Sequence, residues 1–194
     1  MKKNEIIWRE ILTQFLDKKV VSFTQKKLAS RFKFSLSTVF NALKPLRGLG
    51  AVEVRGRDFR IIDFEKILMY WATRRQLEKE IIYQTFVNKN IHKIESEMPP
   101  QTIFAAYSAW RLRFPHLPAD YDKVYVYTFN SREIQDRFPF DSRPANLIVW
   151  QADSFLEDYG SNLPLAQLFV DFWNLPEWYA KDFLDALREK LNFS

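Results

Sequence analysis

Residues 24–62 carry the pattern that most constrains the fold of this 194-residue chain. Thr24 and Ser35 each precede a short amphipathic stretch, and hydroxyl residues at such positions cap the first free N–H groups of a helix. The connection between the two stretches is too short for anything but a tight turn. We therefore expect a helix-turn-helix, in which the second helix runs from Leu36 to about Arg47 and ends at a pair of glycines.

A β-hairpin and a preceding helix complete this part of the chain. The β-rich runs 51–55 and 59–62 are separated by Gly56-Arg57-Asp58, which predicts a hairpin with a basic tip. Upstream, apolar residues recur at helical spacing, which predicts an amphipathic helix. Its predicted apolar side is Ile6, Ile7, Ile11, Leu12, Phe15 and Leu16, and its predicted polar side is Lys2, Glu5, Arg9 and Lys19.

The helix after Ser35 has two sides of different chemistry. By helical spacing we expect five apolar residues to pack inward: Leu36, Val39, Phe40, Leu43 and Leu46. The outward side then holds small polar residues and a lysine: Ser35, Ser37, Thr38, Asn41 and Lys44. Such a side fits the major groove of DNA, where Asn pairs with adenine, Ser and Thr reach base edges or phosphates, and Lys reaches guanine or the backbone.

The charge is divided unevenly along the chain. Residues 1–93 hold 20 Lys and Arg against 9 Asp and Glu, a net charge of +11, whereas residues 94–194 hold 9 against 15, a net charge of −6. A basic half attracts a polyanion, and an acidic half is repelled by one unless it faces away. The cations that we expect to contact phosphates are Lys26, Lys27, Arg31, Arg55, Arg57 and Arg60.

The segment TQKKLASRFKFSLSTVFNALKPLRGLGAVEVRGRDFRI resembles the winged helix-turn-helix family of prokaryotic regulators. Helix, helix, turn, helix and basic hairpin follow one another in the order of that family. The resemblance implies sequence-specific binding of double-stranded DNA and a role in transcriptional regulation. Some winged helices instead bind RNA or mediate protein contacts, so a protein-interaction module remains the alternative.

The remainder of the chain predicts a companion α+β domain. A connecting helix is expected from Phe64 toward Phe86, with Arg74 and Arg75 on its solvent side, and another helix is expected from Ile103 to Phe114. Residues 124–129 and 146–150 are continuous apolar runs typical of the buried strands of a central sheet. Pro164 and Pro176 suit the first turns of two final helices. The predicted organisation is a winged helix in 1–64, a connecting helix region in 65–93 and an α+β domain in 94–194.

The stretches PQTIFAAYSAWRLRF, DKVYVYTF and NLPLAQLFVDFWNLPEWYAKDFLDAL resemble the C-terminal domain of AbiEi-like antitoxin regulators. Such proteins join a winged helix to an α+β domain and repress the operon that encodes them and a partner toxin. The resemblance implies a possible protein partner or second subunit bound through this domain. It assigns operator reading to Ser37, Thr38, Asn41 and Lys44, support to Arg55 and Arg57, and Asp171 to the companion fold.

Few residues suit catalysis or metal binding. The chain has no Cys and only His92 and His116. The pair Asp120 and Asp122 is similar to the metal-binding acids of nucleotidyltransferases, but the Gly-Ser of that family lies upstream, whereas here Gly160-Ser161 lies downstream. No Gly-rich phosphate loop can be written. We therefore expect no catalytic residue, metal site or cofactor, and a nucleotidyltransferase-like enzyme is the weaker alternative. No apolar run suits a signal peptide or a membrane span, so we expect a cytoplasmic protein.

Overall fold

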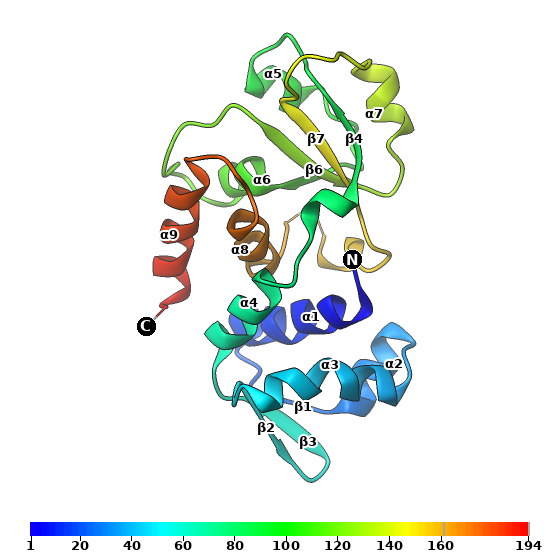
Figure 1. The fold of residues 1–194 in the computed structure, drawn as a ribbon, viewed down its shortest axis with the longest axis vertical. Coiled ribbons are helices and arrows are strands. Elements are labelled where there is room, and N and C mark those ends of the chain that lie inside the picture. The colour runs from blue at the N-terminus through cyan, green and yellow to red at the C-terminus, as the bar shows by residue number, and fades with distance from the viewer. Residues whose placement is uncertain (161, 194) are drawn as a thin grey trace. The chain divides into compact units, whose positions relative to one another are not determined.

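The computed structural model describes residues 1–160 and 162–193, and the chain divides into two compact units. Unit 1 comprises residues 1–75, 164–170 and 191–194, and unit 2 comprises residues 76–163 and 171–190. The predicted connecting region, 65–93, is thus divided between the two units. Each unit contains helices and one small sheet, so the predicted α+β class is confirmed (Figure 1).

Unit 1 is built mainly from the first 75 residues. Its elements are α1 (Lys3–Lys18), β1 (Ser22–Phe23), α2 (Gln25–Phe32), α3 (Leu36–Gly48), β2 (Val52–Arg55), β3 (Asp58–Ile61) and α4 (Phe64–Ala72). The three strands form an antiparallel sheet in the order β1-β3-β2. Two short helices joined by a tight turn and followed by a hairpin are therefore present, as the sequence predicts.

The core of unit 1 forms where α1 packs against α3 and α4. Ile7 and Ile11 of α1 are completely buried, as are Val39 and Leu46 of α3. The indole Nε1 of Trp8 donates a hydrogen bond of 2.9 Å to the carbonyl oxygen of Ala42, which joins α1 to the middle of α3. This packing holds α3 by one side.

The predicted polar side of α1 is wrong at two positions. Glu5 and Arg9 are buried, with exposed fractions of 3% and 0%. The Oε2 atom of Glu5 accepts hydrogen bonds from Nε1 of Trp71 at 3.1 Å and from Nη1 of Arg75 at 3.2 Å. Arg9 donates from Nη1 to Oε1 of Gln167 at 2.9 Å. Arg75, expected on the solvent side, is likewise buried, because α4 and residues 164–170 cover the polar side of α1.

The predicted continuous connecting helix is also wrong. After α4 the chain forms the 3₁₀ turn η1 (Leu77–Glu80) and then the strand β4 (Ile81–Thr85). Residues 81–87 are mostly β-branched or aromatic and favour a strand, and here β4 gains hydrogen bonds from pairing with a central strand of unit 2. The helical spacing of Ile82 and Phe86 is therefore overridden by sheet formation.

Unit 2 contains a four-stranded sheet. Its other elements are α5 (Ile91–Ser96), β5 (Ile103–Ala105), α6 (Ala106–Arg113), β6 (Val124–Thr128), α7 (Arg132–Arg137), β7 (Leu147–Gln151) and η2 (Glu157–Tyr159). Two further helices follow, α8 (Leu165–Trp173), which begins in unit 1, and α9 (Ala180–Leu191). The sheet order is β4-β7-β6-β5, with β6 and β7 parallel and the outer strands antiparallel to them.

Two predictions for unit 2 are confirmed and two need correction. The runs predicted as buried strands are β6 and β7, at the centre of the sheet. The helix expected from Ile103 begins only at Ala106, because residues 103–105 pair with β6 and Ala106 then adopts a positive φ of 44°. The last helix begins at Ala180, so Pro176 is not in its first turn.

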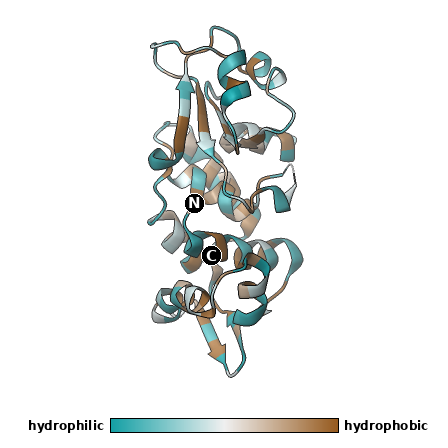
Figure 2. Cartoon of the chain, turned by 90° about the vertical axis from the view of Figure 1, so that its right-hand side faces the viewer, coloured by the Kyte–Doolittle hydropathy of each residue, from teal (hydrophilic) through white to brown (hydrophobic). Residues whose placement is uncertain are grey.

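One face of the sheet forms the apolar core of unit 2. Val124 and Val126 of β6 and Leu147 and Val149 of β7 pack with apolar residues of the α5 and α7 segments. Figure 2 shows hydrophobic residues, in brown, on strands of this sheet. The alternate side chains of β6 and β7 lie on the opposite face, where the polar network described below is found.

The buried ion pair of unit 1 gives a first prediction. Replacement of Glu5 by Gln removes the charge of the carboxylate that lies 3.2 Å from the guanidinium of Arg75, a side chain only 1% exposed, and should lower the free energy of unfolding by about 3 kcal/mol. The exposed pair between Lys66 and Asp63 serves as the control, because Lys66→Ala should cost little. Urea denaturation followed by tryptophan fluorescence measures both.

The double variant Glu5→Leu with Arg75→Met separates charge from packing. It removes both buried charges at once and should recover most of the stability that Glu5→Gln loses. Equal losses in Glu5→Gln and Lys66→Ala would show that the buried pair contributes no more than a surface pair.

Candidate nucleic-acid interface

Two side-chain caps position the helices of the predicted recognition motif. The hydroxyl of Thr24 accepts a hydrogen bond from the backbone N–H of Lys27, and that of Ser35 accepts one from the N–H of Thr38. Both caps are predicted by the sequence and confirmed. Lys33, in the turn between α2 and α3, adopts the left-handed conformation with a φ of 52°. The start of α3 is therefore fixed by local hydrogen bonds.

The outer side of α3 is polar where the sequence predicts it. Ser35, Ser37, Asn41 and Lys44 are exposed, and Thr38 is half-buried. The hydroxyl of Ser35 lies 2.8 Å from that of Ser37 and 2.9 Å from that of Thr38. The three hydroxyls form a cluster at the first turn of α3, while Asn41 and Lys44 follow along the same side of the helix.

For two of the five residues of α3 that were predicted to pack inward, the prediction is wrong. Val39, Leu43 and Leu46 are buried, but Leu36 is 56% exposed and Phe40 is 44% exposed. Ala42 takes part in the buried side instead. The inward side of α3 is narrower than the apolar pattern suggests, because α1, α2 and β2, which pack on this helix, bury residues 39, 42, 43 and 46 and leave Leu36 and Phe40 exposed.

The cations of α2 differ in their surroundings. Lys26 and Lys27 are exposed at the start of the helix. Arg31 makes an ion pair with Glu10 of α1, with Nε and Oε1 3.0 Å apart, and the side chain of Glu10 is 3% exposed. The sequence did not predict this pairing, which compensates part of the charge of Arg31.

The hairpin arginines form a small network around one carboxylate. Glu53 on β2 accepts hydrogen bonds from Nε of Arg55 at 2.9 Å and from Nε of Arg60 at 2.7 Å. These bonds, that from Arg55 first, lower the pKa of Glu53. Arg57 lies in the two-residue turn, beside Gly56 with its φ of 56°, and is exposed. Sequence analysis did not identify Glu53, although a hairpin register that places it opposite Arg60 predicts an ion pair between them.

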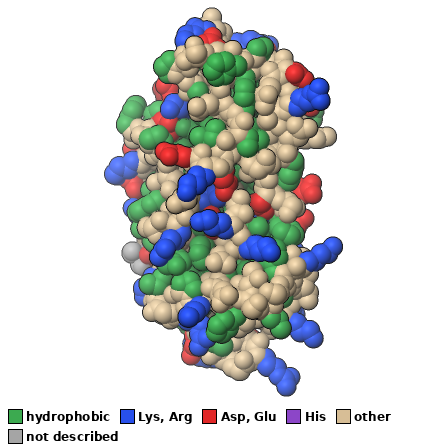
Figure 3. All heavy atoms as spheres, turned by 45° about the vertical axis from the view of Figure 1, so that its right-hand side comes forward, with side chains coloured by type: hydrophobic (Ala, Val, Ile, Leu, Met, Phe, Trp, Pro, Cys, Tyr) green, Lys and Arg blue, Asp and Glu red, His purple; other side chains and the backbone are tan. Residues whose placement is uncertain are grey.

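The helices α2 and α3 lie in a stretch without acidic residues. Asp17 and Glu53 are consecutive acidic residues in the chain. The basic residues between them are Lys18, Lys19, Lys26, Lys27, Arg31, Lys33, Lys44 and Arg47. In Figure 3, blue Lys and Arg side chains project from the surface of unit 1, including its hairpin end. The stretch that includes α2 and α3 therefore carries an excess of positive charge, whereas the hairpin also holds Glu53 and Asp58.

Asp120 and Asp122, the acidic pair of the nucleotidyltransferase-like alternative, have different surroundings in unit 2. Asp120 is exposed, and Oδ1 of Asp122 accepts a hydrogen bond of 2.5 Å from the hydroxyl of Tyr179. The part of the chain that the structure describes holds no group of three His, Asp or Glu residues placed to bind a metal ion. Ser161, named in the nucleotidyltransferase comparison, lies outside the described residues.

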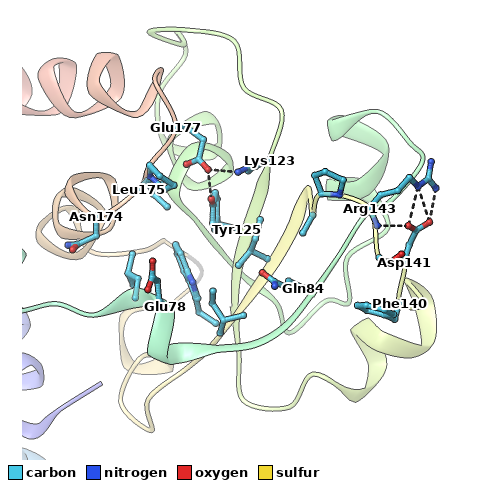
Figure 4. Close-up of a pocket in the computed structure, with 18 residues that line it drawn as sticks. Glu78, Gln84, Lys123, Tyr125, Phe140, Asp141, Arg143, Asn174, Leu175 and Glu177 are labelled. Carbon is cyan, nitrogen blue, oxygen red and sulfur yellow. Dashed lines mark hydrogen bonds and ion pairs between the residues drawn. The ribbon is translucent and has the colours of Figure 1, made fainter.

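Unit 2 contains a groove of about 570 Å³ over one face of its sheet (Figure 4). Tyr125 and Trp150, with ring centroids 4.8 Å apart, form part of its apolar lining. At one side Glu177 accepts hydrogen bonds from the hydroxyls of Tyr125 at 2.8 Å and Tyr107 at 3.0 Å, and lies 2.6 Å from Nζ of Lys123. These partners satisfy the Glu177 carboxylate within the protein.

A second buried carboxylate in unit 2 lies beside one of the two histidines. Glu95, with a side chain 2% exposed, accepts hydrogen bonds from Arg111 at 2.6 Å and from the hydroxyl of Tyr121 at 2.7 Å. His92 lies 3.3 Å from the same carboxylate and is 73% exposed. His116 contributes its backbone carbonyl to a hydrogen bond from Trp110. Sequence analysis assigned neither histidine an acidic partner, and Glu95 at i+3 from His92 was the available signal.

Comparison with known proteins gives no family: no family model matches the chain, and neither does any curated protein. Over residues 1–160 and 162–193, no helix combines the length and the apolar character needed to cross a membrane.

The tyrosines of unit 2 give a prediction for alkaline pH. Burial, with Glu177 as the second cause, raises the pKa of Tyr107 and of Tyr125. Their contribution to stability is therefore complete below the ordinary tyrosine pKa of about 10 and falls above it, because only the unfolded chain ionises there. Each tyrosine should lower the free energy of unfolding by up to about 1.4 kcal/mol per pH unit.

Denaturant unfolding between pH 9 and pH 11.5 measures this slope. Above pH 10 the free energy of unfolding of Tyr125→Phe should decrease less steeply than that of wild type. The matched control is Tyr70→Phe, which replaces a half-buried tyrosine of unit 1. Identical slopes in wild type and Tyr125→Phe would contradict the assignment.

Proposed function

We propose that the chain is a sequence-specific double-stranded DNA-binding transcriptional regulator, in which residues 1–64 act as a winged helix. In this proposal α3 enters the major groove and the β2-β3 hairpin contacts the phosphate backbone. The observation that carries the proposal is the outer side of α3, where Ser37, Asn41 and Lys44 are exposed on a helix held from behind by its buried residues. The regulator is expected to act in the cytoplasm.

The charges around α3 support the proposal. Lys26 and Lys27 are exposed at the N-terminal end of α2, and Arg57 is exposed at the hairpin tip. Phosphate neutralisation by such cations supplies much of the affinity of DNA-binding proteins and makes it sensitive to salt. Because no acidic residue lies between Asp17 and Glu53, α2 and α3 carry no carboxylate that would oppose this attraction.

A protein-interaction role for unit 2 is a second candidate, in line with the AbiEi-like resemblance. Phe140 and Trp178 are 72% and 79% exposed, which is unusual for large aromatic side chains. Aromatic residues of this kind are enriched at protein interfaces. In this second proposal unit 2 binds a protein partner or a second subunit.

Salt-dependent binding tests the DNA proposal. Fluorescence anisotropy with mixed genomic duplex should show binding that weakens as salt rises. The double variant Arg55→Ala with Arg57→Ala should reduce the slope of log K against log [salt] by roughly 1.8, since each lost phosphate contact is worth about 0.9. Lys79→Ala with Arg132→Ala, which removes two exposed cations of unit 2, is the charge-matched control. Equal slopes in the two double variants would remove the hairpin from the mechanism.

The carboxylate of Glu53 gives a prediction of opposite sign. Glu53→Gln releases Arg55 and Arg60 from their ion pairs and raises the hairpin charge by one, so duplex binding at low salt should tighten several-fold. Anisotropy titration at two salt concentrations measures the effect. Glu78→Gln, an exposed carboxylate of unit 2, should leave the affinity unchanged. Weaker binding by Glu53→Gln would indicate that Glu53 orders the arginines rather than opposing the DNA.

A further inference from the structure

The outer side of α3 carries an apolar flank beside its polar residues. Leu36 is 56% exposed and Phe40 is 44% exposed. The two residues are one helical turn apart, so their side chains project from the same flank of the helix. Ser37 and Asn41 follow each of them by one position and form the adjoining polar stripe. The exposed side of α3 is therefore partly apolar and partly hydrogen-bonding.

The surroundings of this flank indicate the chemistry of what would cover it. Lys44 and Arg47 are exposed farther along the same helix, and Lys26 and Lys27 are exposed on α2. The acid-free stretch between Asp17 and Glu53 leaves these cations without a nearby carboxylate in sequence. The exposed side of α3 therefore combines nearby cations, hydrogen-bonding side chains and an apolar flank. A covering surface that is anionic, offers hydrogen bonds and has small apolar groups matches all three.

The major groove of DNA has all three properties where thymine occurs. Each thymine places its C5 methyl group in the groove, beside the O4 acceptor and between the phosphate chains, and apolar side chains contact that methyl directly. The charge of α2 and α3 therefore favours DNA over a second copy of this basic unit.

We propose that Leu36 and Phe40 read thymine by contact with its C5 methyl group, so that the preferred DNA site contains thymines next to the bases read by Ser37 and Asn41. This inference rests on the proposed DNA-binding function. Four residues of helix advance about 6 Å, and stacked base pairs are about 3.4 Å apart. With α3 along the groove, the two methyl groups belong to base pairs one or two steps apart.

Replacement of thymine by deoxyuridine tests the inference, because it removes the methyl group and leaves the hydrogen-bonding edge and the base pairing intact. A preferred duplex is first selected from a random library with the full chain. Each thymine is then replaced singly, and affinities are measured by fluorescence anisotropy. Wild type should bind about fourfold more weakly at one or two positions, the value expected for losing one buried methyl group.

The variants assign the effect to the two side chains. Phe40→Ala and Leu36→Ala should each bind the thymine and deoxyuridine duplexes equally at one of the sensitive positions. Asn41→Ala should keep the fourfold ratio there and lose base preference elsewhere. Ile62→Ala removes an apolar side chain of similar exposure, 51%, outside α3 and should keep every ratio. Thermal melting of each variant shows whether it is folded.

The outcomes distinguish this inference from the proposed function. If no duplex binds at any salt concentration, both fail. If duplexes bind but selection yields no preferred site, or if thymine and deoxyuridine duplexes bind wild type equally, methyl reading is wrong and DNA binding stands. A change in sedimentation of Phe40→Ala without any change in the thymine ratio would assign the flank to self-association and overturn the inference.

Discussion

The attachment of α3 to α1 is the constraint on which the functional side of unit 1 depends. Val39, Ala42, Leu43 and Leu46 occupy one side of α3 and are buried, and the indole of Trp8 is hydrogen-bonded to the carbonyl of Ala42. A helix held along one stripe must present the opposite stripe to solvent. The side chains available for recognition are therefore decided by the packing behind them, and this is why small polar residues occur on a helix whose other positions are apolar.

The electrostatics of unit 1 are set by which cations have carboxylate partners. Arg31 is paired with the buried Glu10, and Arg55 and Arg60 share Glu53, whereas Arg57 is exposed at the turn. Exposed ion pairs contribute little to stability, so the expected effect of Glu53 is on charge: it pairs with two arginines of a narrow hairpin and reduces the net charge of that hairpin. A count of Lys and Arg from sequence treats these cations as equal, and the structure separates them.

The features that sequence analysis predicted correctly are those fixed by nearby residues. The caps at Thr24 and Ser35 and the hairpin turn at Gly56 depend on bonds within a few positions, and β6 and β7 are continuous apolar runs. The wrong predictions concern residues whose partners are distant in the sequence. Arg9 finds Gln167 more than 150 residues along the chain, so its burial has no local signal.

A related error affects the candidate site, where helical periodicity assigned Leu36 and Phe40 to the core together with the residues of α3 that are buried. Periodicity identifies which residues share a side, but it does not say how wide the covering surface is. α1 covers a stripe that includes Val39 and Leu43 and leaves Leu36 and Phe40 outside it. The width of that stripe depends on the position of α1, which only the folded structure supplies.

The acidic excess of residues 94–194 takes on a different meaning once the carboxylates are located. Glu95 is bonded to Arg111 and Tyr121, Glu177 to Lys123 and two tyrosines, and Asp122 to Tyr179. Glu95 and Glu177 are buried acceptors for hydroxyl and cationic donors, and removal of such an acceptor leaves those donors unsatisfied. Part of the negative charge of unit 2 therefore holds its tyrosine-rich interior together rather than forming an anionic surface. Arg111 and Lys123 are already counted in the net charge of −6 for residues 94–194, so these pairs leave that net charge unchanged, and the expectation that this half is repelled by DNA unless it faces away is not altered by them.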